Sequence, residues 1–136
     1  IAGLCDGTID AIATDHAPHH RDEKEVEYNS ALSGISGFET AFALCMDALV
    51  HAHHMTMEEF VQVACTNPAK ILGKNCGKLE VGRDADFIIA DIAKEWTVDR
   101  KEFVSKGKNT PFDGRTVHGR VLETYVGGKR IYKYED

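Results

Sequence analysis

The sequence predicts an α/β fold in two regions, with helices before about residue 75 and strands after it. Three observations carry this prediction. A short apolar run at 9–14 ends at a carboxylate, apolar residues then recur at helical spacing over 38–49, and compact β-type runs follow residue 85. We therefore expect residues 1–75 to form one region and residues 76–136 a second.

Composition narrows the class of protein. The net charge of −6 argues against a nucleic-acid partner, because proteins that bind the phosphate backbone gather Lys and Arg on one face. No apolar run approaches the ~18 residues of a membrane span, and no signal-peptide pattern is present. Four cysteines without C-x-x-C spacing predict reduced thiols in a cytoplasmic protein rather than a disulfide framework. Because the chain begins with Ile1, we expect a piece of a longer protein.

The run from Ile9 to Thr14 is the first element. Turn chemistry at Asp6-Gly7 precedes it, and its apolar character predicts a buried strand of the parallel type. Asp15 then stands at the carboxyl end of that strand, the end at which α/β barrels carry their catalytic groups.

A long loop is expected next. Residues 21–28 are dominated by charge, and residues 30–37 are rich in small side chains. A connection of this length is typical of a mobile lid or binding loop, and the alternative is a solvated surface excursion.

Two capping boxes then predict helix starts. Ser36 to Glu39 matches the first, before a helix of roughly four turns, and Thr56 to Glu59 matches the second. Met55 and Phe60 stand at the positions of a hydrophobic staple for the second helix.

A short helix and then strands complete the chain. Asn67-Pro68 opens the helix and Gly73 closes it. Residues 86–91 read as a strand, residues 96–116 as an extended loop, and residues 121–134 as two strands joined at Gly127-Gly128. With a boundary near Asn75, each region is small for a core of its own, so we expect exposed apolar surface on 9–14 and on the later strands.

The end of the first apolar run carries the candidate chemistry. Asp15, His16 and His19 are residue types that bind zinc, and a metal-bound water is a nucleophile near neutral pH. The structural alternative is that Asp15 caps a turn. Strand-end placement, the stiff Pro18 and the loop that follows favour a site.

A second histidine group has a simpler interpretation. His51, His53 and His54 lie at the end of a predicted helix, where imidazoles interact favourably with the helix dipole, so a surface role is favoured over a metal site.

Several motifs resemble those of the dihydroorotase family of cyclic amidohydrolases. They are Thr-Asp-His-Ala-Pro-His at 14–19 and Gly-Ile-Ser-Gly-Phe-Glu-Thr at 34–40, followed by 66–73, 77–82 and 85–91. The later motifs are shared by dihydropyrimidinases and allantoinases, whereas Asp-His-Ala-Pro-His discriminates. The resemblance implies the last part of a TIM-like (β/α)8 barrel in residues 1–75 and β-sandwich strands in residues 76–136, incomplete on their own.

The resemblance also implies roles for four residues. Asp15 resembles the last metal-binding carboxylate, which also moves a proton to the leaving ring nitrogen, and His19 resembles the residue that holds the substrate carboxylate. Ser33 and Gly34 fall where the family offers backbone groups to the ring, although the usual Phe-Gly is replaced here. His16 receives no role.

The function implied is zinc-dependent, reversible hydrolysis of dihydroorotate to N-carbamoyl-aspartate, with one or two Zn²⁺ ions. The resemblance places the other metal ligands upstream of Ile1, so residues 1–136 alone are expected to be inactive. For the full-length protein it implies a homodimer, and association with aspartate transcarbamoylase is left open. The alternatives are another cyclic amidohydrolase, acting on dihydropyrimidines, hydantoins or allantoin, and a noncatalytic dihydroorotase-like subunit that supports aspartate transcarbamoylase.

Overall fold

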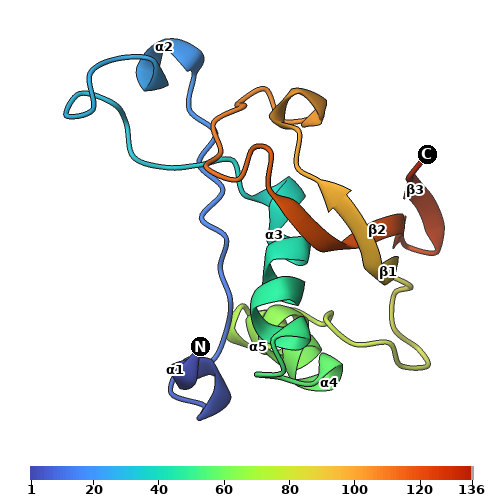
Figure 1. Cartoon of the computed structure of the whole chain (residues 1–136). Helices are drawn as coiled ribbons and strands as arrows, with labels where there is room; N and C mark the ends of the chain where they lie inside the picture. The colour runs from blue at the N-terminus through green and yellow to red at the C-terminus, as the bar shows by residue number, and fades with distance from the viewer. Residues whose placement is uncertain (136) are drawn as a thin grey trace.

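A computed structural model describes residues 1–135, with helical segments in the first half and an antiparallel sheet in the second (Figure 1). The short helices α1 and α2 precede α3, which continues into the π-helical segment η1. In order, the elements are α1 Ala2–Cys5, α2 Arg21–Lys24, α3 Phe38–Cys45, η1 Met46–His51, α4 Met57–Val61, η2 Gln62–Thr66, α5 Asn67–Ile71, β1 Phe87–Thr97, η3 Arg100–Glu102, β2 Thr116–Val126 and β3 Lys129–Lys133.

The strand expected at 9–14 is not formed, and this part of the prediction is wrong. The segment runs extended beside α3 (Figure 1), but its backbone joins helical residues: the Ile12 N–H donates to the Val63 carbonyl at 3.1 Å. A single parallel bridge, between His16 and Ile35, follows it. A parallel strand needs neighbouring strands on which to form a ladder, and the described sheet is built only from β1, β2 and β3.

The helices after residue 55 follow the sequence prediction closely. Thr56 and Glu59 form the expected capping box, with Met55 and Phe60 both buried in one cluster. At the other end Gly73 has φ 62°, and the N–H groups of Gly73 and Lys74 donate to Lys70 and Ala69, which is a Schellman motif.

The two helices predicted here are one helical run. η2 joins α4 to α5, so Pro68 lies near the start of α5 but not at a break in the chain. Proline has no N–H for the preceding turn. The π-helical segment η2, Gln62–Thr66, with its wider turn, lies immediately before α5.

The sheet has the order β1-β2-β3, and both pairs are antiparallel. Gly127 and Gly128 have φ of 56° and 75°, as the tight turn of the predicted hairpin requires. β1 extends beyond the predicted run to Thr97, and its pairing with β2 shifts register after Asp91. The Asp91 carboxylate accepts hydrogen bonds there from the N–H groups of Ala93 and Lys94. The loop that follows contains the short helix η3.

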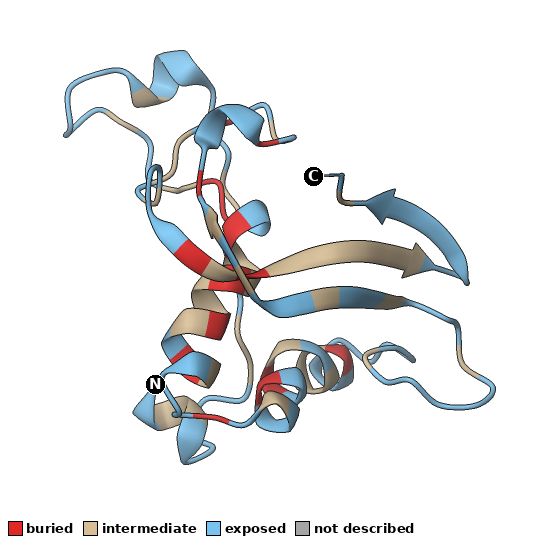
Figure 2. Ribbon diagram, turned by 45° about the vertical axis from the view of Figure 1, so that its right-hand side comes forward, coloured by how far each residue is buried: buried red, intermediate tan, exposed pale blue. Residues whose placement is uncertain are grey.

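Two buried clusters hold these parts together (Figure 2). One lies among the helices, around Met46, Leu49 and Phe60. The other joins Ala43 of α3 to Val98, Phe103 and Val117, so residues from both predicted regions share it. The boundary near Asn75 stays a prediction.

Apolar side chains are exposed where the sequence suggested. Ile9 in the extended segment is 49% exposed, and Ile88 and Ile89 on β1 are 48% and 45% exposed. Across residues 1–135, no helix combines the length and apolar character that crossing a bilayer demands. All four cysteines carry free thiols.

Candidate functional site

Asp15 lies where the extended segment turns toward the loop. Its φ is 44°, a left-handed conformation that few residues other than glycine adopt, although Asp tolerates it better than most. The residue is exposed, and its carboxylate makes no hydrogen bond or ion pair within residues 1–135. Asp15 therefore presents a free carboxylate on a constrained backbone.

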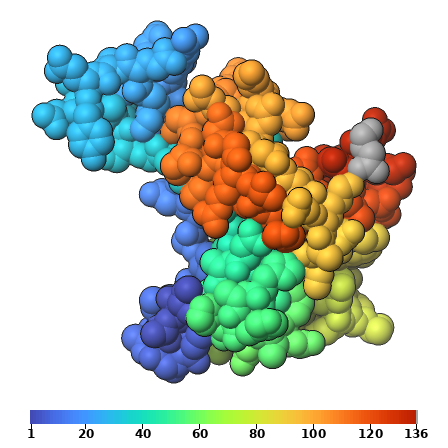
Figure 3. All heavy atoms as spheres, viewed as in Figure 1, coloured from blue at the N-terminus to red at the C-terminus, as the bar shows by residue number. Residues whose placement is uncertain are grey.

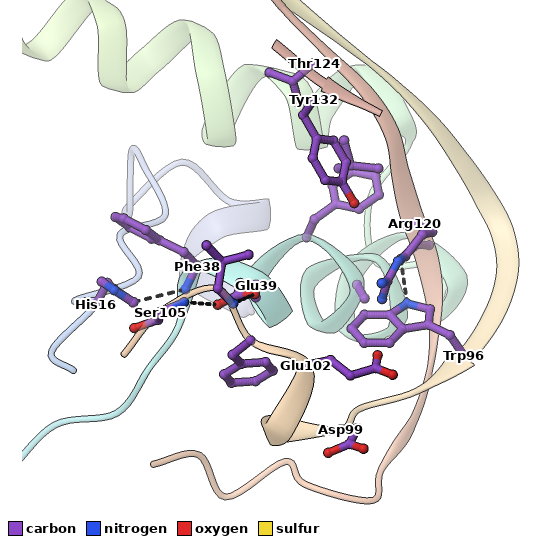
Figure 4. A pocket seen from close by; sticks show the side chains of 16 residues that line it. His16, Phe38, Glu39, Trp96, Asp99, Glu102, Ser105, Arg120, Thr124 and Tyr132 are labelled. Atoms are coloured by element: carbon purple, nitrogen blue, oxygen red, sulfur yellow. Dashed lines mark hydrogen bonds between the residues drawn. The ribbon is translucent and has the colours of Figure 1, made fainter. Parts of the chain in front are cut away.

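His16, which the sequence left without a role, caps helix α3. Its Nδ1 accepts a hydrogen bond from the Gly37 N–H at 3.0 Å. It also accepts from the Phe38 N–H at 3.3 Å (Figure 4). The imidazole also stacks on the Phe38 ring, with centroids 4.0 Å apart. The capping box predicted at Ser36 is wrong, because the Ser36 hydroxyl donates instead to the Gly107 carbonyl and Glu39 turns to residues 104 and 105.

His19, Ser33 and Gly34 lie together in the structure. The His19 Nε2 donates to the Ser33 carbonyl at 2.7 Å, so Nε2 carries a proton, and Nδ1 lies 3.7 Å from the Glu23 carboxylate. A Cβ built on Gly34 would lie only 2.5 Å from the Ala17 Cβ and 3.2 Å from the His19 Nε2. Only glycine fits this crossing.

The loop between these residues is folded back on itself. α2 is capped by His20, whose Nδ1 accepts from the Asp22 N–H, and the Lys24 ammonium donates to the carbonyls of Leu32 and Gly34. The charged segment thus forms one helical turn that closes the loop, and it projects as a lobe away from the sheet (Figure 3).

A segment from the second region runs along this loop. The Asn109 Nδ2 donates to the Gly34 carbonyl at 2.9 Å, while the Ser36 N–H donates to the Asn109 carbonyl at 2.8 Å. Gly107 lies against Pro18 so closely that a Cβ there would come within 2.6 Å of the Pro18 Cβ. Residues 107–109 therefore brace both segments of the candidate site, the one with Pro18 and the one with Gly34.

The described residues do not form a zinc site by themselves. No group of three or more His, Cys, Asp and Glu side chains within residues 1–135 gathers closely enough to hold a metal ion. Asp15 supplies at most one ligand, and a zinc site needs at least three from protein.

The second histidine group is a surface feature, as predicted. His51, His53 and His54 are exposed, and the His51 Nε2 lies 2.8 Å from the Ile92 carbonyl oxygen.

A cavity of about 610 Å³ opens on the other side of His16, between α3 and the sheet (Figure 4). Its walls include the Trp96 indole, over which the Arg120 guanidinium lies at 4.1 Å from the ring centroid. None of Asp15, His19, Ser33 or Gly34 lines it. The cavity and the predicted site share only the His16 segment.

Sequence reasoning missed three residues that build the site: His16, Lys24 and Asn109. The first had a usable signal, because it lies in the motif with Asp15, but its partner at Gly37 is 21 residues away. Lys24 reads as one charge among many, and Asn109 reads as part of a polar loop with no periodicity.

The comparisons with known proteins match nearly the whole chain, including the segments with these motifs. A sequence model described as "Amidohydrolase family" matches residues 1–131. The dihydroorotase of Acetivibrio thermocellus is 51% identical over 98% of this chain and 31% of its own length, and that of Thermoanaerobacter sp. is 52% identical over the same shares. The chain thus spans about a third of the length of the curated relatives it matches.

Solved structures agree on the fold. An L-hydantoinase from Arthrobacter aurescens superposes with a TM-score of 0.89 at 34% identity, covering 96% of this chain and 30% of the hydantoinase. A dihydropyrimidinase from Brevibacillus agri superposes with a TM-score of 0.90 at 23% identity, covering 97% of this chain and 30% of that one.

Proposed function

The chain belongs to the amidohydrolase family, and from that premise we propose that it forms part of a dihydroorotase. The reaction would be reversible hydrolysis of the cyclic amide of dihydroorotate to N-carbamoyl-aspartate, a step of pyrimidine synthesis. The observation that carries the proposal is the similarity to dihydroorotases at 51% identity over 98% of the chain. The geometry of His19, Ser33 and Gly34 supports it.

Asp15 has the proton-transfer role in this proposal. A water oxygen forms a bond to the amide carbonyl carbon and gives a proton to the Asp15 carboxylate. The carbon–nitrogen bond of the ring then breaks, and Asp15 returns the proton to the leaving nitrogen. A carboxylate without hydrogen bonds inside the chain is free to do this, and its constrained backbone limits where it points.

His19 would hold the substrate carboxylate through Nδ1. The Nε2 atom is already committed to the Ser33 carbonyl, so Nδ1 is the ring nitrogen left for a ligand. To donate to a carboxylate, Nδ1 must carry a proton as well as Nε2. In the structure Nδ1 lies 3.7 Å from the Glu23 carboxylate, and a substrate carboxylate would compete with that contact.

Zinc and the partners belong to the longer protein in this proposal. Asp15 would be the one ligand that this chain contributes to one or two Zn²⁺ ions, and the others would come from the two thirds of the relatives that the chain does not cover. The full-length protein would be a homodimer in the cytoplasm, and association with aspartate transcarbamoylase is a further expectation for it.

A chimera tests this function. The matched part of the Acetivibrio thermocellus dihydroorotase is replaced by residues 1–136, and turnover of dihydroorotate is followed with zinc present. We expect activity from the chimera, its loss in the Asp15→Asn variant, and none from residues 1–136 alone. A folded, zinc-loaded chimera without turnover would contradict the proposal, and turnover by the chain alone would contradict its incompleteness.

The second candidate is a hydantoinase, favoured by the superposition on the Arthrobacter aurescens enzyme. The His19→Ala variant of the chimera separates the two, because only dihydroorotate brings a ring carboxylate to Nδ1. We expect the KM for dihydroorotate to rise about tenfold, since a hydrogen bond to a charged group is lost. An unchanged KM, with turnover of hydantoin by the unmodified chimera, would favour the hydantoinase.

A further inference from the structure

Asn109 touches the loop that carries Gly34, although it lies 75 residues further along the chain. We propose that Asn109 is a positioning residue, which fixes the Gly34–Ile35 peptide and so sets the geometry of the substrate loop. This inference rests on the proposed function where it concerns catalysis. The claim that Asn109 fixes the Gly34–Ile35 peptide does not depend on that function.

The orientation of two successive peptides depends on two side chains. The Ser33 carbonyl accepts from His19, so the Gly34 N–H in the same planar peptide points away from that imidazole. This N–H has no hydrogen-bond partner within residues 1–135. The His19 bond thus orients this peptide and leaves its N–H open.

The Gly34 carbonyl belongs to the next peptide and accepts from both Asn109 and Lys24, at 2.9 and 3.1 Å. The same peptide leads into the parallel bridge between Ile35 and His16, where the Ala17 N–H donates to the Ile35 carbonyl. Asn109 thus acts on the segment beside Asp15 through one peptide and one bridge.

The amide of Asn109 can take only one orientation. Because the Gly34 carbonyl can only accept, Nδ2 must face it, and Oδ1 is then buried without a partner in the described residues. Burying an acceptor in this way is unfavourable, so packing alone does not account for an asparagine here. The Asn109 side chain therefore contributes its hydrogen bond to the Gly34 carbonyl.

Lys24 does not replace this donor. Its ammonium is shared between the Leu32 and Gly34 carbonyls and comes from the lobe of the loop itself, so it moves with the loop. Asn109 is fixed from outside the loop, because its neighbour Lys108 donates to the carbonyl of Phe103, and Phe103 is buried in the cluster with Val98 and Val117. It is the anchor from outside the loop.

The test uses three variants of the chimera. Asn109→Ala removes the donor, Asn109→Asp keeps the shape but offers only acceptors, and Asn29→Ala is the matched control on an exposed asparagine of the same loop. KM and kcat are measured for dihydroorotate, and amide hydrogen exchange is measured over peptides that contain Ala17 and Ser36. Residues 57–61 of α4 serve as the internal reference.

We expect both Asn109 variants to raise KM about tenfold while kcat falls by no more than about threefold, because binding geometry is lost before chemistry. Exchange at Ala17 and Ser36 should quicken about tenfold, with α4 and the Asn29→Ala variant unchanged. A general loss of fold would instead quicken exchange in α4 as well.

Unchanged KM and unchanged local exchange in Asn109→Asp would overturn the inference, and so would equal quickening at α4. If the unmodified chimera shows no turnover, the proposed function fails, whereas hydrogen exchange on residues 1–136 still decides whether Asn109 holds the loop.

Discussion

At the N-terminus of α3 the acceptor for the free N–H groups is an imidazole from another segment. Gly37 stands at the cap position and has no side chain, so the bonds that Ser, Thr or Asp would make are supplied by the His16 Nδ1. This fixes the tautomer, because Nδ1 must keep its lone pair and Nε2 must carry the proton. His16, the residue next to Asp15, is thereby held at the N-terminus of α3.

The cap predicts different outcomes for two substitutions of His16. His16→Phe keeps a ring to stack on Phe38 but offers no acceptor, so unfolding free energy should fall by about 1 kcal/mol, the usual value of an N-cap. His16→Asn keeps an acceptor and should retain the bond to Gly37. Urea unfolding followed by circular dichroism measures both, and equal stability of His16→Phe and the parent chain would refute the capping role.

Among the elements, those with local signals were predictable. The Thr56 capping box, the Gly73 terminus and the Gly127-Gly128 turn each depend on residues within a few positions, and all three are present. The strand at 9–14 was not, because pairing requires neighbours that an apolar pattern does not supply. The end of β1 was misplaced for a related reason, since the bulge after Asp91 interrupts the alternation that marks a strand.

The Thr56 capping box gives a prediction at this scale. Thr56→Ala removes the acceptor for the Glu59 N–H and should lower the unfolding free energy by about 1 kcal/mol. Thr56→Ser keeps the hydroxyl and serves as the control. It should lower the unfolding free energy by no more than about a few tenths of a kcal/mol. Thermal melts of the two variants decide between them, and a similar drop in both would assign the effect to the methyl group and not to the cap.

Over the whole molecule, the candidate site depends on contacts between the two predicted regions. His19, Ser33 and Gly34 could be proposed as candidates from the motifs that resemble those of a known family. Their supports could not, because Asn109 and Gly107 approach only in the folded chain, and nothing in a polar loop reveals which residues it will touch. Gly107 lies so close to Pro18 that a Cβ at position 107 would come within 2.6 Å of the Pro18 Cβ.

Gly107→Ala should therefore destabilise the molecule. The added methyl group would meet the Pro18 Cβ at 2.6 Å and its Cα at 2.9 Å, and neither atom can rotate away. Overpacking of this kind costs about 1–3 kcal/mol. Lys106→Ala, at the exposed neighbouring position, should change stability little in the same denaturation measurement, and a Gly107→Ala variant as stable as Lys106→Ala would contradict the contact.

The brace formed by residues 107–109 also fixes the order of events during synthesis. The chain emerges from its N-terminus, so the segment with Asp15 and the loop to Gly34 leave the ribosome long before their supports. Until Asn109 follows, 75 positions after Gly34, the Gly34 carbonyl lacks its outer donor and Pro18 lacks its cover. Closing so distant a contact is entropically slow. Within this chain the candidate site residues are therefore synthesised before the residues that support them, and we expect their arrangement to be completed late.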